Sequence, residues 1–255
     1  MPAPATPREL LIVAIARLLD GCRHVAVGAS SPIPASAAML LRAQKEQQDE
    51  VVRISVLGSQ EHNFFTNGGV ELFDCAAQGR IDAFFLGGGQ IDGQGNINLV
   101  GGGGDYPQTK VRWPGSFGSS YLAFLVPRVI LFREEHSPRV FVEQVDFVSA
   151  PGTSPPEVYR PGGPVALLTG LGLFSFDRQA GRFTLRSVHP GHTVEEIVAA
   201  TGFKFDIPEI VPTTPGPDAA TLALLRGRVR EEVSECYGEF AAAWRAEVPE
   251  VVTAV

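Results

Sequence analysis

Three short apolar segments, each followed by a glycine, constrain the fold of this chain more than any other feature. They are residues 24–27, 51–57 and 83–86, and the glycines are Gly28, Gly58 and Gly87. Sequences typical of helices precede and separate them, at residues 7–20, 35–48 and 70–78. This alternation predicts a mainly parallel sheet whose strands are joined by flanking helices.

The second half of the chain has a different residue pattern. After Pro127, β-branched runs predict short strands at residues 129–132, 140–142, 145–148 and 165–169, and a hairpin around residues 177–181. A short helix is expected from Val194 to Gly202, and a long amphipathic helix over residues 218–242. We expect an α/β fold with an antiparallel extension in this half, built as one domain over residues 1–255.

Composition excludes several classes of partner. The chain has 21 Lys and Arg residues against 28 Asp and Glu, a net charge of -7, which argues against nucleic acid and against an anionic membrane surface. Cys22, Cys75 and Cys236 show neither disulfide nor zinc-site spacing, which fits a reducing compartment. The early apolar run from Leu10 to Ala16 is too short to span a membrane. We therefore expect a cytoplasmic protein.

The glycines also suggest where a ligand binds. In open parallel sheets, ligands bind beyond the carboxyl ends of the strands, so the loops at Gly28, Gly58 and Gly87 form the candidate site. The third strand runs directly into a stretch rich in glycine and amide side chains, residues 87–98. Glycine exposes backbone N–H groups to close approach, which favours a ligand bearing phosphate or carbonyl oxygens.

Common catalytic motifs are absent. Asp92 stands where a dinucleotide fingerprint needs its third glycine, and no Gly-Lys-Ser/Thr follows any glycine run. The sequence has neither a Gly-x-Ser-x-Gly elbow nor a His-Glu-x-x-His helix. The five histidines are scattered, so we expect no metal site and no bound cofactor.

Several ordered segments together resemble the β subunits of class I CoA-transferases, glutaconate CoA-transferase above all. The segments are Gly87–Asp92, Gly95–Asn98, Gly104–Lys110, Gly115–Ser120, Val145–Gly152, Gly170–Asp177 and Thr201–Phe203. The resemblance implies a site shared with an α-type subunit and an acyl-CoA thioester as substrate. It also implies that Gly115–Ser120 lies against the thioester and that Gly87–Asn98 shapes the pocket. The substrate-binding residues expected on this basis and from the strand ends are Gly28, Ser30, Gly58, Gly88, Gly89, Gln90, Asn96, Gly115, Ser116, Gly118 and Ser119.

One position departs from the family pattern. Transferring β subunits carry a glutamate after the second strand, which attacks the thioester, whereas this chain has Val56 there. Valine has no lone pair or exchangeable proton and cannot serve as nucleophile, acid or base. Glu61, five residues downstream, is the one nearby substitute that a shifted loop could supply.

Three interpretations of function remain open. The chain also resembles the β subunits of CoA-transferase-like steroid ring-opening hydrolases, which lack the same glutamate. In that group an acidic residue of the α subunit activates water or the substrate. This favours hydrolysis or C–C cleavage of a CoA ester over transfer. The alternative is a non-catalytic subunit that binds CoA or supports its partner. The assembly is expected to be a heteromer with an α-type chain, or else a homo-oligomer.

Overall fold

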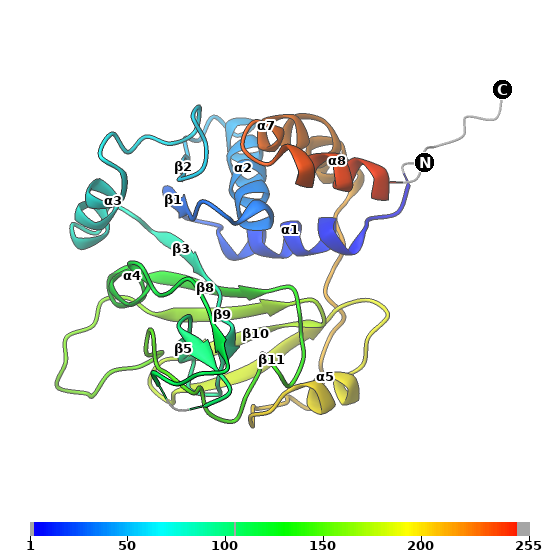
Figure 1. Cartoon of the computed structure of the whole chain (residues 1–255). Coiled ribbons are helices and arrows are strands. Elements are labelled where there is room, and N and C mark those ends of the chain that lie inside the picture. The colour runs from blue at the N-terminus through cyan, green and yellow to red at the C-terminus, as the bar shows by residue number, and fades with distance from the viewer. Residues whose placement is uncertain (1–2, 105, 249–255) are drawn as a thin grey trace. The chain divides into compact units, whose positions relative to one another are not determined.

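The computed structural model describes residues 3–104 and 106–248 (Figure 1). The chain divides into two compact units. Unit 1 comprises the chain up to Gly68 together with the chain from Pro215 onward, and unit 2 comprises Gly69–Thr214. The expectation of a single domain over residues 1–255 stays a prediction.

Unit 1 is built around two parallel strands. β1 (His24–Val27) pairs with β2 (Arg53–Val56) in a register that sets Val27 opposite Val56. The helices of this unit are α1 (Pro7–Leu18), α2 (Pro32–Glu46), α6 (Ala219–Leu224), the π-helical turn η1 (Leu225–Val229), α7 (Arg230–Ser234) and α8 (Gly238–Glu247). Thr6 and Glu9 form a capping box at the start of α1, as the sequence indicates.

Two helix boundaries differ from the prediction. α2 begins three residues early, because proline at its first position is already set for helical geometry. The single helix expected over residues 218–242 is wrong: α6, η1 and α7 follow one another without a break in helical geometry, but α8 is a separate helix. The first part keeps the predicted apolar face through Leu222, Leu225, Val229 and Val233, so periodicity alone does not detect the break that follows. The break ends at Tyr237, which has non-helical geometry before Gly238.

Unit 2 contains the five strands that complete the predicted fold class. β3 (Ala83–Leu86), β8 (Arg128–Arg133) and β9 (Pro164–Thr169) are parallel, and β10 (Gly172–Asp177) and β11 (Arg182–Val188) extend them in antiparallel fashion. The helices are α3 (Gly68–Ala77), which begins at the unit boundary, α4 (Ser119–Leu125) and α5 (Val194–Ala200). The predicted mainly parallel sheet with an antiparallel extension is confirmed.

The predicted strands at residues 140–142 and 145–148 are wrong. In this region the structure has only an isolated bridge between Phe141 and Ile91, in which the Ile91 backbone bonds to the Val140 carbonyl and the Val142 N–H. At residues 145 and 146, side chains take the backbone N–H groups that a strand would use. The N–H of Val145 donates to Asp92, and the N–H of Asp146 donates to Gln90 at 3.0 Å. The glycine-rich stretch instead forms two small hairpins that the sequence did not predict: β4 (Gln90–Ile91) with β5 (Ile97–Asn98), and β6 (Gly101–Gly102) with β7 (Val111–Arg112). Across the described ranges, no helix combines the length and the apolar character needed to cross a membrane.

Two histidines, buried His189 and partly buried His136, join β9 and β11 of unit 2 to the loops beside them. His189 Nε2 donates to the Thr169 carbonyl at 2.9 Å, so its Nδ1 accepts from the Thr214 hydroxyl at 2.8 Å. His136 lies between the hydroxyls of Thr169 and Thr201, at 2.8 and 2.9 Å. Burial lowers the pKa of His136 to about 4 and also lowers the pKa of His189. Both rings are therefore neutral at pH 7 and serve as structural hydrogen-bonding groups.

We expect the stability of unit 2 to fall as the pH drops from about 6.5 to about 4. The unfolded chain binds protons at its histidines near pH 6.5, whereas folded His136 resists protonation until about pH 4. The stability that neutral His136 contributes is thus fully present above pH 6.5 and is lost as the pH falls toward 4, by about 3 kcal/mol. Urea unfolding at several pH values measures this slope. His136→Gln keeps a polar group between the two threonines without titrating, so an unchanged slope in that variant would contradict the assignment.

Candidate active site

In unit 1 the loops that follow β1 and β2 lie against each other at the carboxyl ends of the strands. The N–H of Leu57 donates to the Val27 carbonyl at 3.0 Å. A Cβ at Gly58 would lie 2.9 Å from the Ala29 carbonyl oxygen, so only glycine permits this close approach. The structure therefore brings Gly28, Ser30 and Gly58 together, as predicted from the strand ends, and Ser30 is exposed.

Val56 ends β2 as a fully buried side chain. Its exposed fraction is 0%, and that of Ser55 is also 0%, with the Ser55 hydroxyl 2.9 Å from His24 Nε2. The Val56 N–H donates to the His62 carbonyl and its carbonyl accepts from Ser59, which folds residues 56–62 into a compact loop. Glu61 is exposed on this loop. The last residues of β2 are thus buried and carry no carboxylate of their own.

The thiol at the end of α7 offers no substitute nucleophile. Burial and the neighbouring Glu235 carboxylate raise the pKa of Cys236 to about 11. The thiol is therefore protonated at neutral pH, and a protonated thiol is a weak nucleophile.

In unit 2, the glycines and amides of residues 87–98 have internal partners. A Cβ at Gly88 would meet the Gln90 carbonyl oxygen at 2.6 Å, and one at Gly89 would meet Trp113 at 2.4 Å. Gln90 accepts from Asn98 at 2.7 Å and donates to Asp146 at 3.1 Å. These side chains fix the loop conformation.

Asp92 and Asn96 fix the turn between β4 and β5 in the same way. One Asp92 oxygen accepts from the N–H groups of Gln94 and Asn96 at 3.0 and 3.1 Å, and the other accepts from the Asn96 amide at 3.0 Å. Asn96 in turn accepts from the Gly152 N–H at 3.0 Å. Asp92, which the sequence identified only as a break in the dinucleotide motif, therefore organises this loop. Asp105, in the neighbouring segment of the resemblance, lies outside the described residues.

The segment Gly115–Ser119 leads into α4, and its role against a ligand stays a prediction. Gly115 adopts φ +106° with no atom within 4 Å of its Cβ position, whereas Gly118 packs on Phe73. Ser119 begins α4 and donates to the carbonyl of Ser116.

Phe117, between these glycines, is a feature that the sequence interpretation missed. It has φ +44° and a side chain 83% exposed, and its ring lies 5.6 Å from that of Phe73. A strained backbone that presents an exposed aromatic ring is typical of a binding surface. The signal in the sequence was a phenylalanine inside a glycine-rich turn.

The glycines of unit 1 allow a test of ligand approach that separates folding from binding. Gly28 has ordinary backbone geometry, and an added Cβ would meet only the Ser31 hydroxyl at 3.6 Å. We expect Gly28→Ala to leave the melting temperature unchanged but to weaken binding of an acyl-CoA. Gly58→Ala, which meets backbone at 2.9 Å, should lower stability by about 1–3 kcal/mol. Thermal unfolding and CoA titration measure both, and full binding by Gly28→Ala would contradict a ligand at this loop.

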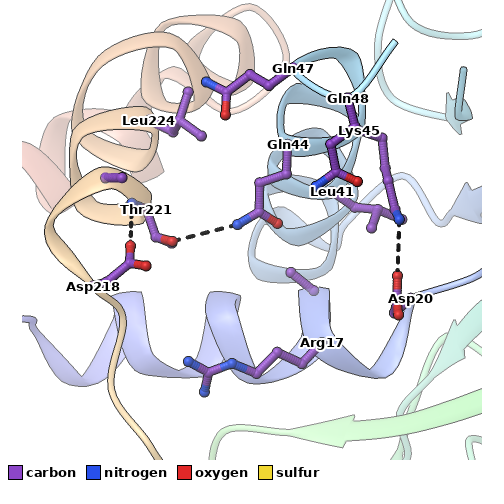
Figure 2. A pocket seen from close by; sticks show the side chains of 12 residues that line it. Arg17, Asp20, Leu41, Gln44, Lys45, Gln47, Gln48, Asp218, Thr221 and Leu224 are labelled. Atoms are coloured by element: carbon purple, nitrogen blue, oxygen red, sulfur yellow. Dashed lines mark hydrogen bonds and ion pairs between the residues drawn. The ribbon is translucent and has the colours of Figure 1, made fainter. Parts of the chain in front are cut away.

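A cavity of about 510 Å³ in unit 1 lies elsewhere, between α1, α2 and α6 (Figure 2). Its charged side chains already have partners: Lys45 pairs with Asp20 at 3.3 Å, Asp218 accepts from the Thr221 N–H at 2.7 Å, and Arg17 donates to the Gly216 carbonyl at 2.8 Å. No residue predicted for the site lines it. The described residues also hold no group of three or more side chains arranged to bind a metal ion.

Comparison with known proteins identifies the family. Residues 8–200 match the coenzyme A transferase family, so the chain belongs to that family. It is 36% identical over 154 residues to the B-type subunit of 3-oxoadipate CoA-transferase from Pseudomonas knackmussii, a match covering 58% of each chain. It is 32% identical over 152 residues to the B-type subunit of glutaconate CoA-transferase from Acidaminococcus fermentans, covering 57% of this chain and 56% of the relative. The chain thus matches a little over half the length of these relatives.

Other relatives carry different activities in their names. The IpdB subunit of a cholesterol ring-cleaving hydrolase from Rhodococcus jostii is 30% identical over 143 residues, covering 52% of this chain and 53% of the relative. The crystal structure of the decarboxylase AibA/AibB has a TM-score of 0.73 at 26% identity, covering 87% of this chain and 93% of that chain. The resemblance to glutaconate CoA-transferase and to the ring-cleaving hydrolases is therefore confirmed at the level of family and fold.

Proposed function

We propose that this chain is the B-type component of a heteromeric enzyme that cleaves a CoA ester, and that no covalent enzyme–CoA intermediate forms on it. The family match and the two B-type relatives support an acyl-CoA substrate and an A-type partner. In this proposal CoA is part of the substrate rather than a bound cofactor.

The observation that carries the proposal is the buried valine at the end of β2. In ping-pong transfer a glutamate carboxylate attacks the thioester carbonyl, the CoA thiolate leaves, and a mixed anhydride forms. Val56 has no atom that can make this bond, and it has an exposed fraction of 0%. Transfer through this chain therefore lacks its first step.

Hydrolysis needs no nucleophile from this chain. A carboxylate of the A-type partner takes a proton from water, the water oxygen attacks the thioester carbonyl, and the CoA thiolate leaves with that proton as the thiol. Backbone N–H groups of the loop near Gly28 would stabilise the oxyanion that develops. Because relatives include a ring-cleaving hydrolase and a decarboxylase, cleavage of a C–C bond in the acyl group of a CoA ester is the second form of this proposal.

The alternative is a non-catalytic role, which the valine at the end of β2 also fits. A chain without a nucleophile can bind CoA or stabilise its partner and perform no chemistry. Gln90 and Asn96 would then act as they do in the structure, by holding the loops, rather than by contacting a ligand.

Co-expression with an A-type chain tests these alternatives. The purified complex and each chain alone are incubated with a panel of acyl-CoA esters, with and without acetate as acceptor, and the products are identified by mass spectrometry. Free acid with CoA, a decarboxylated ester or a ring-opened ester supports cleavage. Acetyl-CoA from the complex supports transfer, and binding without product supports the non-catalytic role. A strict monomer that binds neither an A-type chain nor itself would contradict the heteromer.

A further inference from the structure

The segment that joins α7 to α8 contacts both loops that follow β1 and β2. This segment, residues 235–237, lies outside the part of the chain that matches the family, residues 8–200. Its side chains reach the loops at the carboxyl ends of the strands from the far end of the sequence. All of these contacts are within unit 1.

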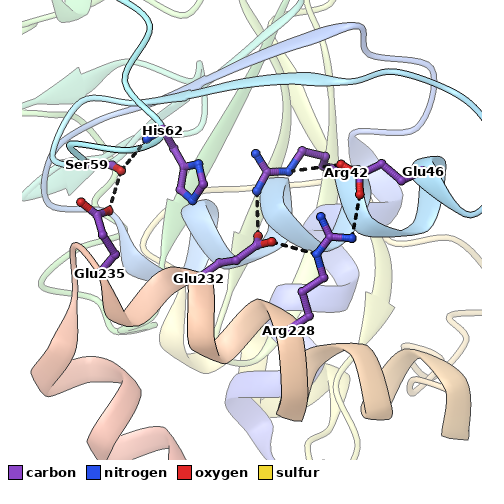
Figure 3. Close-up of polar contacts among 7 residues, drawn as sticks. All are labelled: Arg42, Glu46, Ser59, His62, Arg228, Glu232 and Glu235. Atoms are coloured by element: carbon purple, nitrogen blue, oxygen red, sulfur yellow. Dashed lines mark hydrogen bonds and ion pairs between the residues drawn. The ribbon is translucent and has the colours of Figure 1, made fainter.

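Glu235 holds the loop after β2. Its carboxylate accepts from the Ser59 hydroxyl at 2.6 Å and from the Gln60 N–H at 2.8 Å, and Ser59 accepts from the His62 N–H at 2.8 Å (Figure 3). Although burial acts in the opposite direction, hydrogen bonds from Ser59, Gln60 and Glu61 hold the pKa of Glu235 below its ordinary value. A carboxylate committed to three donors is a weak base and a weak nucleophile, so these contacts favour a positioning role.

Tyr237 holds the loop after β1. Its hydroxyl lies 3.2 and 3.0 Å from the carbonyl oxygens of Gly28 and Ala29, to which it donates, and it accepts from the Ser31 N–H at 3.4 Å. The ring is partly buried, and burial raises the pKa of Tyr237. The hydroxyl is therefore protonated at neutral pH and keeps its donor.

The helix that carries this segment is itself fixed against α2. Arg42 of α2 pairs with Glu232 at 2.7 Å, and Arg228 pairs with Glu46 at 2.6 Å and with Glu232 at 2.8 Å (Figure 3). Glu232 pairs with both arginines, so these contacts form one linked set that joins the α6–α7 helical stretch to α2. α7 thus provides a fixed base from which Glu235 and Tyr237 reach the loops.

We propose that Glu235 and Tyr237 are positioning residues that set the two loops of the CoA-ester site, and this rests on the function proposed above. Two segments far apart in the sequence, the loops after Val27 and after Val56, are fixed relative to each other by one three-residue junction. Loop atoms must be held within a fraction of an ångström for productive binding, so loss of the junction should reduce turnover more than it reduces stability.

The test combines hydrogen exchange of the chain with kinetics of the complex. Glu235→Ala should raise exchange of residues 57–63 about tenfold and lower kcat/KM about tenfold. Tyr237→Phe should do the same for residues 28–33. Glu235→Gln still presents an amide oxygen to Gln60 and should retain kcat/KM within a few-fold. Glu231→Ala, on the exposed side of α7, makes the same charge change and should alter neither quantity.

Each outcome decides a different point. Unchanged exchange in Glu235→Ala and Tyr237→Phe would overturn the proposed contacts. Faster exchange with kcat/KM equal to that of Glu231→Ala would overturn the positioning role. Loss of all activity in Glu235→Gln would overturn it too, because a catalytic carboxylate, unlike a positioning one, cannot be replaced by an amide. If the native complex converts no CoA ester, the proposed function fails, while the exchange data still report the contacts.

Discussion

Replacing Val56 by glutamate is expected to destabilise the chain by about 3 kcal/mol or more rather than to restore a transferase. The side chain at this position is 0% exposed, and the surrounding loop already uses the Val56 N–H and carbonyl in hydrogen bonds to residues 62 and 59. The loop of residues 56–62 contains no Lys or Arg to pair with a carboxylate placed there. Its pKa should rise, and the penalty should grow as the pH rises above about 4.5.

Denaturant unfolding of Val56→Glu at pH 5 and pH 8 measures this effect. Val56→Gln is the matched control, because it has nearly the same shape without the charge, and it should show no such pH dependence. A Val56→Glu variant as stable as the native chain at pH 8 would mean that the end of β2 accommodates a carboxylate, and the transferase interpretation would return.

The second large effect on stability is expected from replacing Arg226. Glu9 has an exposed fraction of 0%, and both of its oxygens lie 2.8 Å from the Arg226 guanidinium. Burial raises the pKa of Glu9, but hydrogen bonds from Arg226, the Thr6 N–H and the Trp244 indole outweigh it, so the pKa lies below its ordinary value. Removal of the cation alone leaves a buried, unpaired charge, and Arg226→Met should cost about 3–5 kcal/mol.

Arg228→Met is the control for this variant. Arg228 is more exposed and pairs with Glu46 and Glu232 near the surface, so its loss should cost about 1 kcal/mol or less. The double variant Glu9→Gln with Arg226→Met should recover part of the stability, since it removes both charges. Because folding lowers the pKa of Glu9, the stability that the Glu9–Arg226 pair contributes is present at neutral pH and is lost as the pH falls below about 4.5. Equal effects of the two arginine variants would contradict the assigned burial.

The strands followed by a glycine were predictable because their apolar composition and the glycine after them indicate the same element. β1 and β3 match the predicted ranges, and β2 lies within the predicted one. The strands expected at residues 140–142 and 145–148 failed for a physical reason. The first segment makes a single bridge, to Ile91, and in the second the side chains of Asp92 and Gln90 take the N–H groups of Val145 and Asp146. A local sequence pattern does not show these distant partners. The contacts of Glu235 could not be predicted either. Its spacing along the helix fits a solvated acidic face, and its partner Ser59 is 176 residues away in the sequence.

The candidate site was predictable in part. The loops at Gly28 and Gly58 come together as the strand order requires, because parallel neighbours place their carboxyl ends at one edge. The roles assigned to Gly88, Gly89, Gln90 and Asn96 remain predictions, since a glycine needed for internal packing and a glycine needed for a ligand have the same sequence. Phe117 shows the converse, an exposed ring that no periodicity marks.

The absence of a covalent enzyme–CoA intermediate on this chain is tested most directly by trapping. The complex is incubated with an acyl-CoA that it binds, treated with borohydride or hydroxylamine, and each chain is weighed by mass spectrometry. A glutamate converted by this chemistry changes mass, whereas Val56, Ser55 and Leu57 offer no carboxylate to convert. The account predicts an unchanged mass for this chain while the complex turns over its substrate. A trapped adduct mapped to Glu61 or Glu235 would contradict it.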